Sequence, residues 1–194
     1  MKNKKLEIIC IYCSIMDGGP ECNFSELKEG RCSMAEYDLK ADNFDYILGG
    51  FLVAIDGYKI IFREMNFYTL LKPMTFLMET LYWLAGRTTN IFDVDEDDPS
   101  RLVLETMSAE KLVLTNIGDG KLTLSFLAAN KEQEKRRGKN YFRDVVIKAE
   151  DWKEAVTLAL EEYFYFAEQA LKENPKSERA YLLSRYISLW KNIV

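Results

Sequence analysis

The chain has 194 residues, of which 48% are hydrophobic and 29% are charged, so we expect a globular protein with a substantial core rather than a disordered one. Its formal net charge of −5 opposes binding to the phosphate backbone of nucleic acids. The sequence has no histidine, which excludes Ser-His-Asp and Cys-His catalytic sites and zinc sites with imidazole ligands.

The N-terminal part is predicted to contain one strand followed by a long irregular stretch. Residues 5–15 are rich in isoleucine, leucine and tyrosine, which favours a strand. The basic residues before this run imitate the start of a signal peptide, but Glu7 interrupts the apolar part and no small-residue cleavage site follows. We therefore expect a cytoplasmic protein. Residues 17–46 are polar and turn-rich, and they show no regular period.

All four cysteines lie in this N-terminal part, at Cys10, Cys13, Cys22 and Cys32. Zinc sites usually repeat a short Cys-x-x-Cys spacing, which the second pair lacks. Cys10 and Cys13 also lie in a predicted strand, where residues three apart point to opposite faces. We interpret these two as small buried apolar residues and predict no metal, and a disulfide between Cys22 and Cys32 would require an exported protein.

Two β-prone runs flank Asp56-Gly57 and are predicted to form a hairpin over residues 47–64. Asp-Gly is a strong hairpin signal, because a type I′ turn needs positive φ at both central positions. Pro73 then favours the first turn of a helix over residues 73–85. Gly86 is expected to end this helix, and the apolar residues around most of its circumference predict a central core helix.

Four more strands are predicted before the C-terminal helices. A Gly-Asp-Gly turn joins the middle two into a second hairpin over residues 111–128. The charged segment 130–140, which precedes the last strand, is expected to be a solvated loop. The four strands cover residues 101–107, 111–117, 121–128 and 142–149.

The C-terminal part is predicted to form two antiparallel helices. Apolar residues recur at i, i+3 and i+4 over residues 151–173, and Asp151 and Glu154 fit a capping box at the start of this helix. Ser177 is expected to cap a second amphipathic helix over residues 177–193. The short connection between them makes the two helices antiparallel neighbours.

These elements predict an α+β fold with a mainly antiparallel sheet, since tight turns join the strands and βα alternation is lacking. One domain is expected over residues 1–194, strand-rich in 1–149 and helical in 150–194. The fold is defined by two hairpins, one central core helix and the C-terminal helix pair, which cover residues 47–64, 111–128, 73–85, 151–173 and 177–193.

The densest acidic run follows the predicted core helix. Alternate carboxylates suit calcium, but an EF-hand loop that started at Asp93 would need glycine and glutamate where the chain has Asp98 and Leu104. We interpret the run as a solvated loop that could also receive a basic protein partner. Its candidate partner-binding residues are Asp93, Asp95, Glu96, Asp97 and Asp98.

A basic cluster of five lysines and arginines lies between residues 131 and 139. Together with Tyr141 and Phe142 it has the composition of a segment that binds phosphates and stacks bases. Both aromatic residues lead into a predicted strand, however, and the acidic remainder of the chain opposes nucleic acid. We therefore predict no nucleic-acid partner.

An aromatic block, Tyr163 to Phe166, lies within the first C-terminal helix. Four consecutive positions cover all sides of a helix, so Tyr163 falls on the apolar stripe while Tyr165 and Phe166 must face something else. Core packing against the second helix is one interpretation. An exposed remainder would be an interaction patch, because tyrosine and phenylalanine are enriched at interfaces, so Tyr163, Tyr165 and Phe166 complete the candidate partner-binding residues.

The sequence favours protein binding over catalysis and assigns no catalytic residue or cofactor. A bacterial, toxin-neutralising inhibitor of the immunity type is one concrete form, by analogy with small acidic inhibitors that lack motifs. Its partner would be a basic toxin or enzyme, and a homodimer is also compatible. No apolar run reaches the about 18 residues of a membrane span, so no membrane partner is expected. Two alternatives are a histidine-free enzyme, with carboxylate, tyrosine or lysine chemistry between helix 73–85 and the sheet, and small-ligand binding in an apolar cavity of the sheet face.

Overall fold

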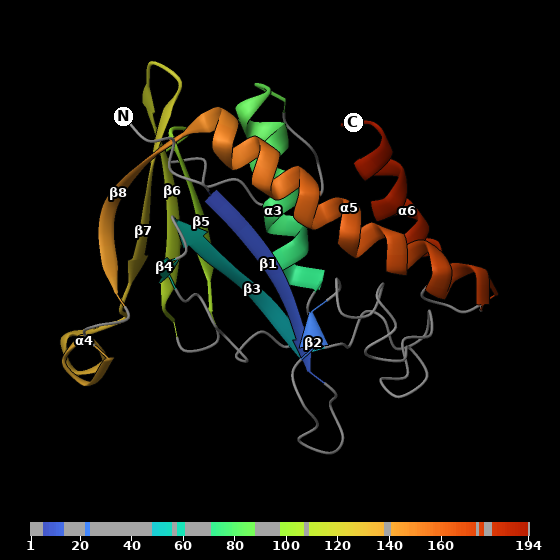
Figure 1. Ribbon diagram of the computed structural model, residues 1–194, viewed down its shortest axis with the longest axis horizontal. Coiled ribbons are helices and arrows are strands. Elements are labelled where there is room, and N and C mark those ends of the chain that lie inside the picture. The colour runs from blue at the N-terminus through green and yellow to red at the C-terminus, as the bar shows by residue number, and fades with distance from the viewer. Residues whose placement is uncertain are drawn as a thin grey trace.

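The computed structural model contains two four-stranded antiparallel sheets and four helices among the residues that it describes (Figure 1). The strand orders are β2-β1-β3-β4 and β5-β6-β7-β8. The predicted α+β fold is therefore confirmed, with its strands divided between two sheets. The described residues are 6–13, 22–23, 48–55, 58–60, 71–87, 98–106, 109–137, 141–173, 175–176 and 180–193.

The first sheet is built on β1 (Leu6–Cys13) and β3 (Leu48–Ile55), which pair along their whole length. β4 (Tyr58–Ile60) pairs with the end of β3, which confirms the first predicted hairpin, although its turn at Asp56-Gly57 lies outside the described residues. On the other side of β1, β2 (Cys22–Asn23) adds a short strand that the sequence does not predict.

The second sheet is a meander of the four strands predicted in this part of the chain. Each strand pairs with the next one along the chain, and Figure 1 shows β8 curving strongly at the outer edge of the sheet. The predicted turn between the middle two strands is confirmed, since Gly118, Asp119 and Gly120 all have positive φ. The strands are β5 (Arg101–Glu105), β6 (Lys111–Gly118), β7 (Lys121–Leu127) and β8 (Phe142–Lys148).

The two faces of the second sheet differ, as the alternation of its sequence predicts. One face is apolar and buried, and it forms a large part of the hydrophobic core. The other face carries the side chains between them, including hydroxyl and charged groups. The buried face consists of Leu102, Leu104, Leu112, Leu114, Leu122, Leu124, Phe126 and Ile147.

The predicted core helix is α3 (Leu71–Leu84), which begins two residues before Pro73. It ends as the sequence predicts, in a Schellman motif with Gly86 at a φ of 67°. The Gly86 N–H donates to the Trp83 carbonyl at 3.0 Å, and the Arg87 N–H donates to the Tyr82 carbonyl at 2.9 Å. These two bonds satisfy carbonyls that the end of a helix otherwise leaves without donors.

The longest helix, α5 (Ala149–Glu173), lies across β1 and packs against both α3 and α6 (Figure 1). α5 therefore lies as centrally in the molecule as α3, although the sequence predicts only α3 to be a central core helix. A buried hydrogen bond joins the two helices, because the Trp152 indole N–H donates to the Thr80 hydroxyl at 2.9 Å. This bond satisfies the one polar group of a side chain that is otherwise surrounded by core.

The capping box predicted at Asp151 and Glu154 is wrong, because α5 begins two residues earlier, at Ala149. The physical reason is that β8 runs directly into the helix, and the Ala149 N–H still bonds the Gly120 carbonyl at 2.9 Å. Asp151 therefore lies inside the first turn, where a carboxylate still interacts favourably with the positive end of the helix dipole.

The second C-terminal helix is α6 (Ala180–Lys191), which confirms the predicted helix pair. The expected cap, Ser177, lies outside the described residues. α6 is held to α3 by the Tyr82 hydroxyl, which donates to the Leu189 carbonyl at 3.0 Å. Two aromatic rings add to its contact with α5, since Phe164 and Trp190 stack with their centroids 5.5 Å apart.

The loop predicted over residues 130–140 is also wrong, because part of it forms the helix α4 (Lys131–Arg137). Asn130 caps this helix by accepting a hydrogen bond from the Gln133 N–H at 2.9 Å. The Gln133 side chain reaches back to the Ala129 N–H at 2.8 Å. The spacing of Asn130 and Gln133 is a capping-box signal, so the sequence contained the means to predict this helix.

One hydrophobic cluster connects both sheets with α3, α5 and α6. Its largest fully buried side chains include Trp152 and Tyr163 from α5, Phe51 from β3 and Met74 from α3. None of the helices within the described ranges has the length and apolar character needed to cross a lipid bilayer.

Candidate functional site

The outward side of α5 carries a continuous line of exposed residues that alternates acidic and apolar groups. We call Glu154, Leu158, Glu161 and Tyr165 the α5 stripe. Spacings of three and four residues place these four side chains on one line along the helix. Leu158 is 59% exposed and Tyr165 is 49% exposed, which are high fractions for large hydrophobic side chains.

Of the predicted aromatic block, only Tyr165 belongs to this surface. Tyr163 is 0% exposed and Phe166 is 3% exposed, and both are part of the hydrophobic core. The Phe166 ring packs edge-on against Tyr165, with their centroids 5.0 Å apart. Surface contact with a partner in this conformation is therefore open to Tyr165 alone, whose ring is held in place by a buried neighbour.

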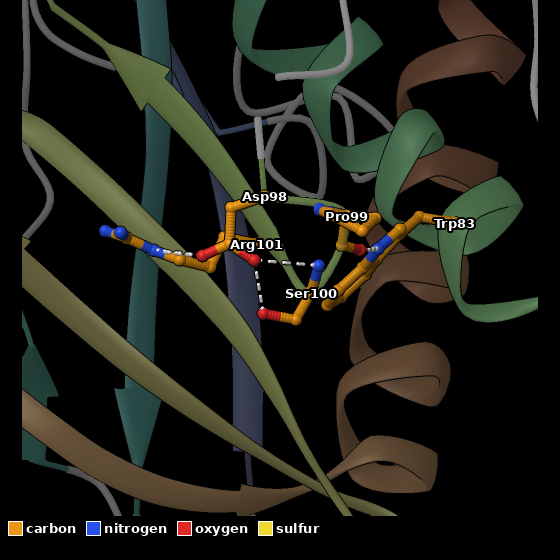
Figure 2. Close-up of polar contacts among 5 residues, drawn as sticks. All are labelled: Trp83, Asp98, Pro99, Ser100 and Arg101. Atoms are coloured by element: carbon orange, nitrogen blue, oxygen red, sulfur yellow. Dashed lines mark hydrogen bonds and ion pairs between the residues drawn. The ribbon is translucent and has the colours of Figure 1, made fainter. Parts of the chain in front are cut away.

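The acidic run is described only at its last member, Asp98, because residues 93–97 lie outside the described residues. Figure 2 shows Asp98 in a compact turn before β5, where its carboxylate accepts hydrogen bonds from the Ser100 N–H at 3.1 Å and the Ser100 hydroxyl at 2.6 Å. These hydrogen bonds, led by that from the hydroxyl, lower the pKa of the Asp98 carboxyl. Asp98 thus has a structural role in starting β5.

The same turn contacts α3 through Trp83 and β5 through Arg101 (Figure 2). The Trp83 indole N–H donates to the Pro99 carbonyl at 2.9 Å and so joins the turn to α3. The Arg101 guanidinium lies 3.9 Å from the second carboxylate oxygen of Asp98, as an exposed ion pair. An exposed pair at this distance adds little stability but restricts where the guanidinium lies.

Among the cysteines, the structure describes the side chain of Cys10 only. As the sequence predicts, Cys10 is a buried residue of the core, and its thiol lies 3.5 Å from the Met74 sulfur. Burial, and to a smaller extent the Glu162 carboxylate, raises the pKa of this thiol well above its ordinary value. Cys10 is therefore an inert thiol in the folded protein.

The sequence suggests the space between α3 and the sheet as the place for a histidine-free active site, and the buried side chains of α3 are mainly apolar. Met74, Leu77, Met78 and Leu81 are all buried there. Carboxylate or lysine chemistry needs polar groups that converge in a space open to substrate. These four residues belong to the hydrophobic core.

A second surface, on the outer face of β5–β8, was not assigned residues from the sequence. It has a concavity of about 380 Å³, whose lining residues include two arginines, one aspartate and three hydroxyl-bearing residues besides apolar ones. The sequence shows the alternation of these strands but does not show that charged groups from β5 and β8 gather there. The lining residues are Arg101, Val113, Thr115, Ile117, Thr123, Ser125, Leu127, Arg143 and Asp144.

Comparison of the chain with protein-family models, with curated proteins and with solved structures finds no match.

Proposed function

We propose that this chain acts by binding another protein that has a basic surface, and that the α5 stripe is its contact region. The exposed Leu158 and Tyr165, which lie on one line of a helix anchored in the core, carry this proposal. The opposite side of the helix is buried, so the stripe is presented on a rigid support. A tyrosine held in this way contributes contact area on binding at a small cost in side-chain entropy.

The charge around these two residues supports a basic partner. Glu154 and Glu161 are exposed on the same line as Leu158 and Tyr165, and the whole chain has a net charge of −5. Complementary charge speeds the encounter of two proteins and orients them, whereas buried apolar contacts slow their dissociation. The stripe supplies both kinds of group.

The concrete form that we propose is a bacterial inhibitor of the immunity type, which would neutralise a basic toxin or enzyme in the cytoplasm. An inhibitor of this kind would act through its surface contacts, and the α5 stripe supplies the exposed apolar and acidic groups for them. The concavity on the outer face of β5–β8 favours small-ligand binding as a second candidate function.

The test uses the polypeptide encoded directly upstream of this chain, since toxin and inhibitor genes are commonly adjacent. Calorimetry should give a complex whose dissociation constant rises by about tenfold or more in Leu158→Ser and in Tyr165→Ala. Glu154→Gln and Glu161→Gln should mainly lower the association rate constant, with an effect that disappears at high salt.

Tyr181→Ala is the matched control, because Tyr181 is 76% exposed but lies on α6, outside the stripe. It should leave the dissociation constant unchanged. The proposal is wrong if the upstream polypeptide does not bind, or if the stripe variants bind it as tightly as the Tyr181→Ala control.

A further inference from the structure

The concavity on the outer face of β5–β8 depends on an irregularity in β8. The pairing of β7 with β8 shifts between Leu124, which lies opposite Val145, and Phe126, which lies opposite Phe142. Two residues of β8, Arg143 and Asp144, therefore lie opposite the single residue Ser125. This is the arrangement of a β-bulge, which redirects side chains at the edge of a sheet.

The bulge brings two opposite charges to one place. Neighbouring residues of a regular strand point to opposite faces of the sheet, yet Arg143 and Asp144 both line the concavity. Asp144 has a φ of 54°, a conformation that aspartate and asparagine adopt more readily than most residues. Its N–H donates to the Ser125 hydroxyl at 2.8 Å, and that hydroxyl lies 3.4 Å from the Asp144 carboxylate.

A second guanidinium lies on the opposite wall. Arg101 belongs to β5, which is separated from β8 by two strands, or about 14 Å at the usual strand spacing. Between the walls, Thr115 and Thr123 face each other across β6 and β7 and place two hydroxyls on the floor. Val113 and Leu127 add apolar surface to the same floor.

The ion pairs that these guanidiniums make are exposed and long. Arg101 lies 3.9 Å from Asp98, and Arg143 lies 3.4 Å from Glu134 of α4. Pairs of this kind contribute little stability, so a ligand that brings a better-placed anionic group can compete with them.

We propose that this concavity binds a small zwitterion, either a free amino acid or a short peptide, with its carboxylate on a guanidinium and its ammonium group on Asp144. A purely cationic ligand would be repelled by Arg101 and Arg143, and a purely anionic ligand would gain attraction from these arginines but none from Asp144, which a zwitterion can also use. The hydroxyls can accept or donate hydrogen bonds to the polar atoms of such a ligand. The volume of about 380 Å³ is near the lower end of the range for small-molecule sites, which suits a ligand of this size.

The site lies on the face of the sheet that is turned away from the core, whereas the α5 stripe lies on a helix. The inference therefore specifies the ligand for the second candidate function and rests on it, but it does not depend on protein binding by the α5 stripe.

The experiment is a titration of the ¹⁵N-labelled full chain, followed by backbone amide shifts, with free L-amino acids and with Gly-Xaa dipeptides as probes. We expect a saturable shift at the amides of Thr123, Ser125 and Asp144. Dipeptides with an acetylated N-terminus or an amidated C-terminus should bind about tenfold more weakly or worse, because each modification removes one charge. Tighter binding of a free amino acid or of a dipeptide identifies which of the two sources the site prefers.

Two variants test which residue binds the ammonium group of the ligand and which binds its carboxylate. Asp144→Asn keeps a residue that tolerates the positive φ, so it should weaken the unmodified dipeptide but not the N-acetylated one. Arg143→Gln should weaken the unmodified dipeptide more than the amidated one. Lys172→Gln, on the exposed end of α5, removes the same charge outside the concavity and should change nothing.

The amide spectra also report whether each variant is folded. If Asp144→Asn does not fold, Thr123→Val takes its place in the titration. This variant should weaken every probe, since it removes a hydroxyl from the floor. The inference is overturned if no probe shifts these amides, if blocked and unblocked dipeptides bind equally, or if the Asp144 and Arg143 variants bind like the Lys172 control.

Discussion

The two faces of the β5–β8 sheet are built from the same strands and carry different kinds of side chain. The inner face is an aliphatic layer in which Leu112, Leu114, Leu122 and Leu124 are all fully buried. The outer face carries arginines, hydroxyls and one carboxylate around a concavity. The comparison teaches that alternation along a strand separates the residues that build the hydrophobic core from those that line the concavity.

The two faces should differ most in the free energy of unfolding that is lost when one side chain on each face is shortened to alanine. Leu114→Ala removes buried apolar atoms and leaves a cavity, which should lower the free energy of unfolding by about 3 kcal/mol. Thr115→Ala, its neighbour on the outer face, should cost about 1 kcal/mol or less. Urea denaturation of both variants measures the two values, and equal costs would show that the outer face is also part of the stabilising core.

A smaller loss of stability should follow from removing the hydrogen bond that joins α3 to α6. Tyr82→Phe removes the hydrogen bond to the Leu189 carbonyl and should lower the free energy of unfolding by about 1 kcal/mol. Burial raises the pKa of the Tyr82 phenol, an effect that the nearby Arg87 guanidinium partly offsets. The stability from this group should therefore be complete below pH of about 10, the ordinary tyrosine pKa, and be lost as the pH rises through the folded-state value.

Urea denaturation of the wild type and of Tyr82→Phe at several alkaline pH values tests this prediction. The difference in the free energy of unfolding between the two proteins should shrink as the pH rises. The wild type then loses the contribution of the Tyr82 phenol, which the variant lacks at every pH. A difference that stays constant up to the most alkaline pH would mean that the phenol does not titrate differently in the folded and unfolded states.

The smallest effect on stability is expected at Asp98, in the turn before β5. Because its pKa is lowered in the folded state, its stabilising effect is present above the ordinary pKa of 3.8 and is lost as the pH falls through the lower folded-state value. Asp98→Asn should therefore lower the melting temperature slightly at neutral pH and not at strongly acidic pH. Melting curves of both proteins across this range decide the point, and an offset that does not depend on pH would argue against it.

Local periodicity determined most of the fold, because side chains two residues apart on a strand, or three to four apart on a helix, share a face whatever the rest of the chain does. The buried leucines of β5–β7 and the buried side of α5 both follow from it. Turn chemistry gave the hairpin at residues 118–120 for the same reason, since the preference of glycine for positive φ is local.

Local signals were less reliable where two elements meet. The start of α5 could not be read from its capping pattern, because a hydrogen bond from Ala149 to the Gly120 carbonyl, far away in sequence, sets where β8 ends. The opposite case is α4, whose cap at Asn130 and Gln133 is local and could have been predicted. The sequence also could not tell that Phe166 packs inside while Tyr165 remains outside, because that depends on what covers each side of α5.

The outer-face site was decided by tertiary structure. The sequence by itself put Arg101, Arg143 and Asp144 on strands, but strict alternation would separate the last two. Only the pairing of β8 with β7, and the bulge that this pairing contains, places both on the same face opposite Arg101. Composition and periodicity thus determined which residues form the core, whereas the register between strands decided which charges lie together.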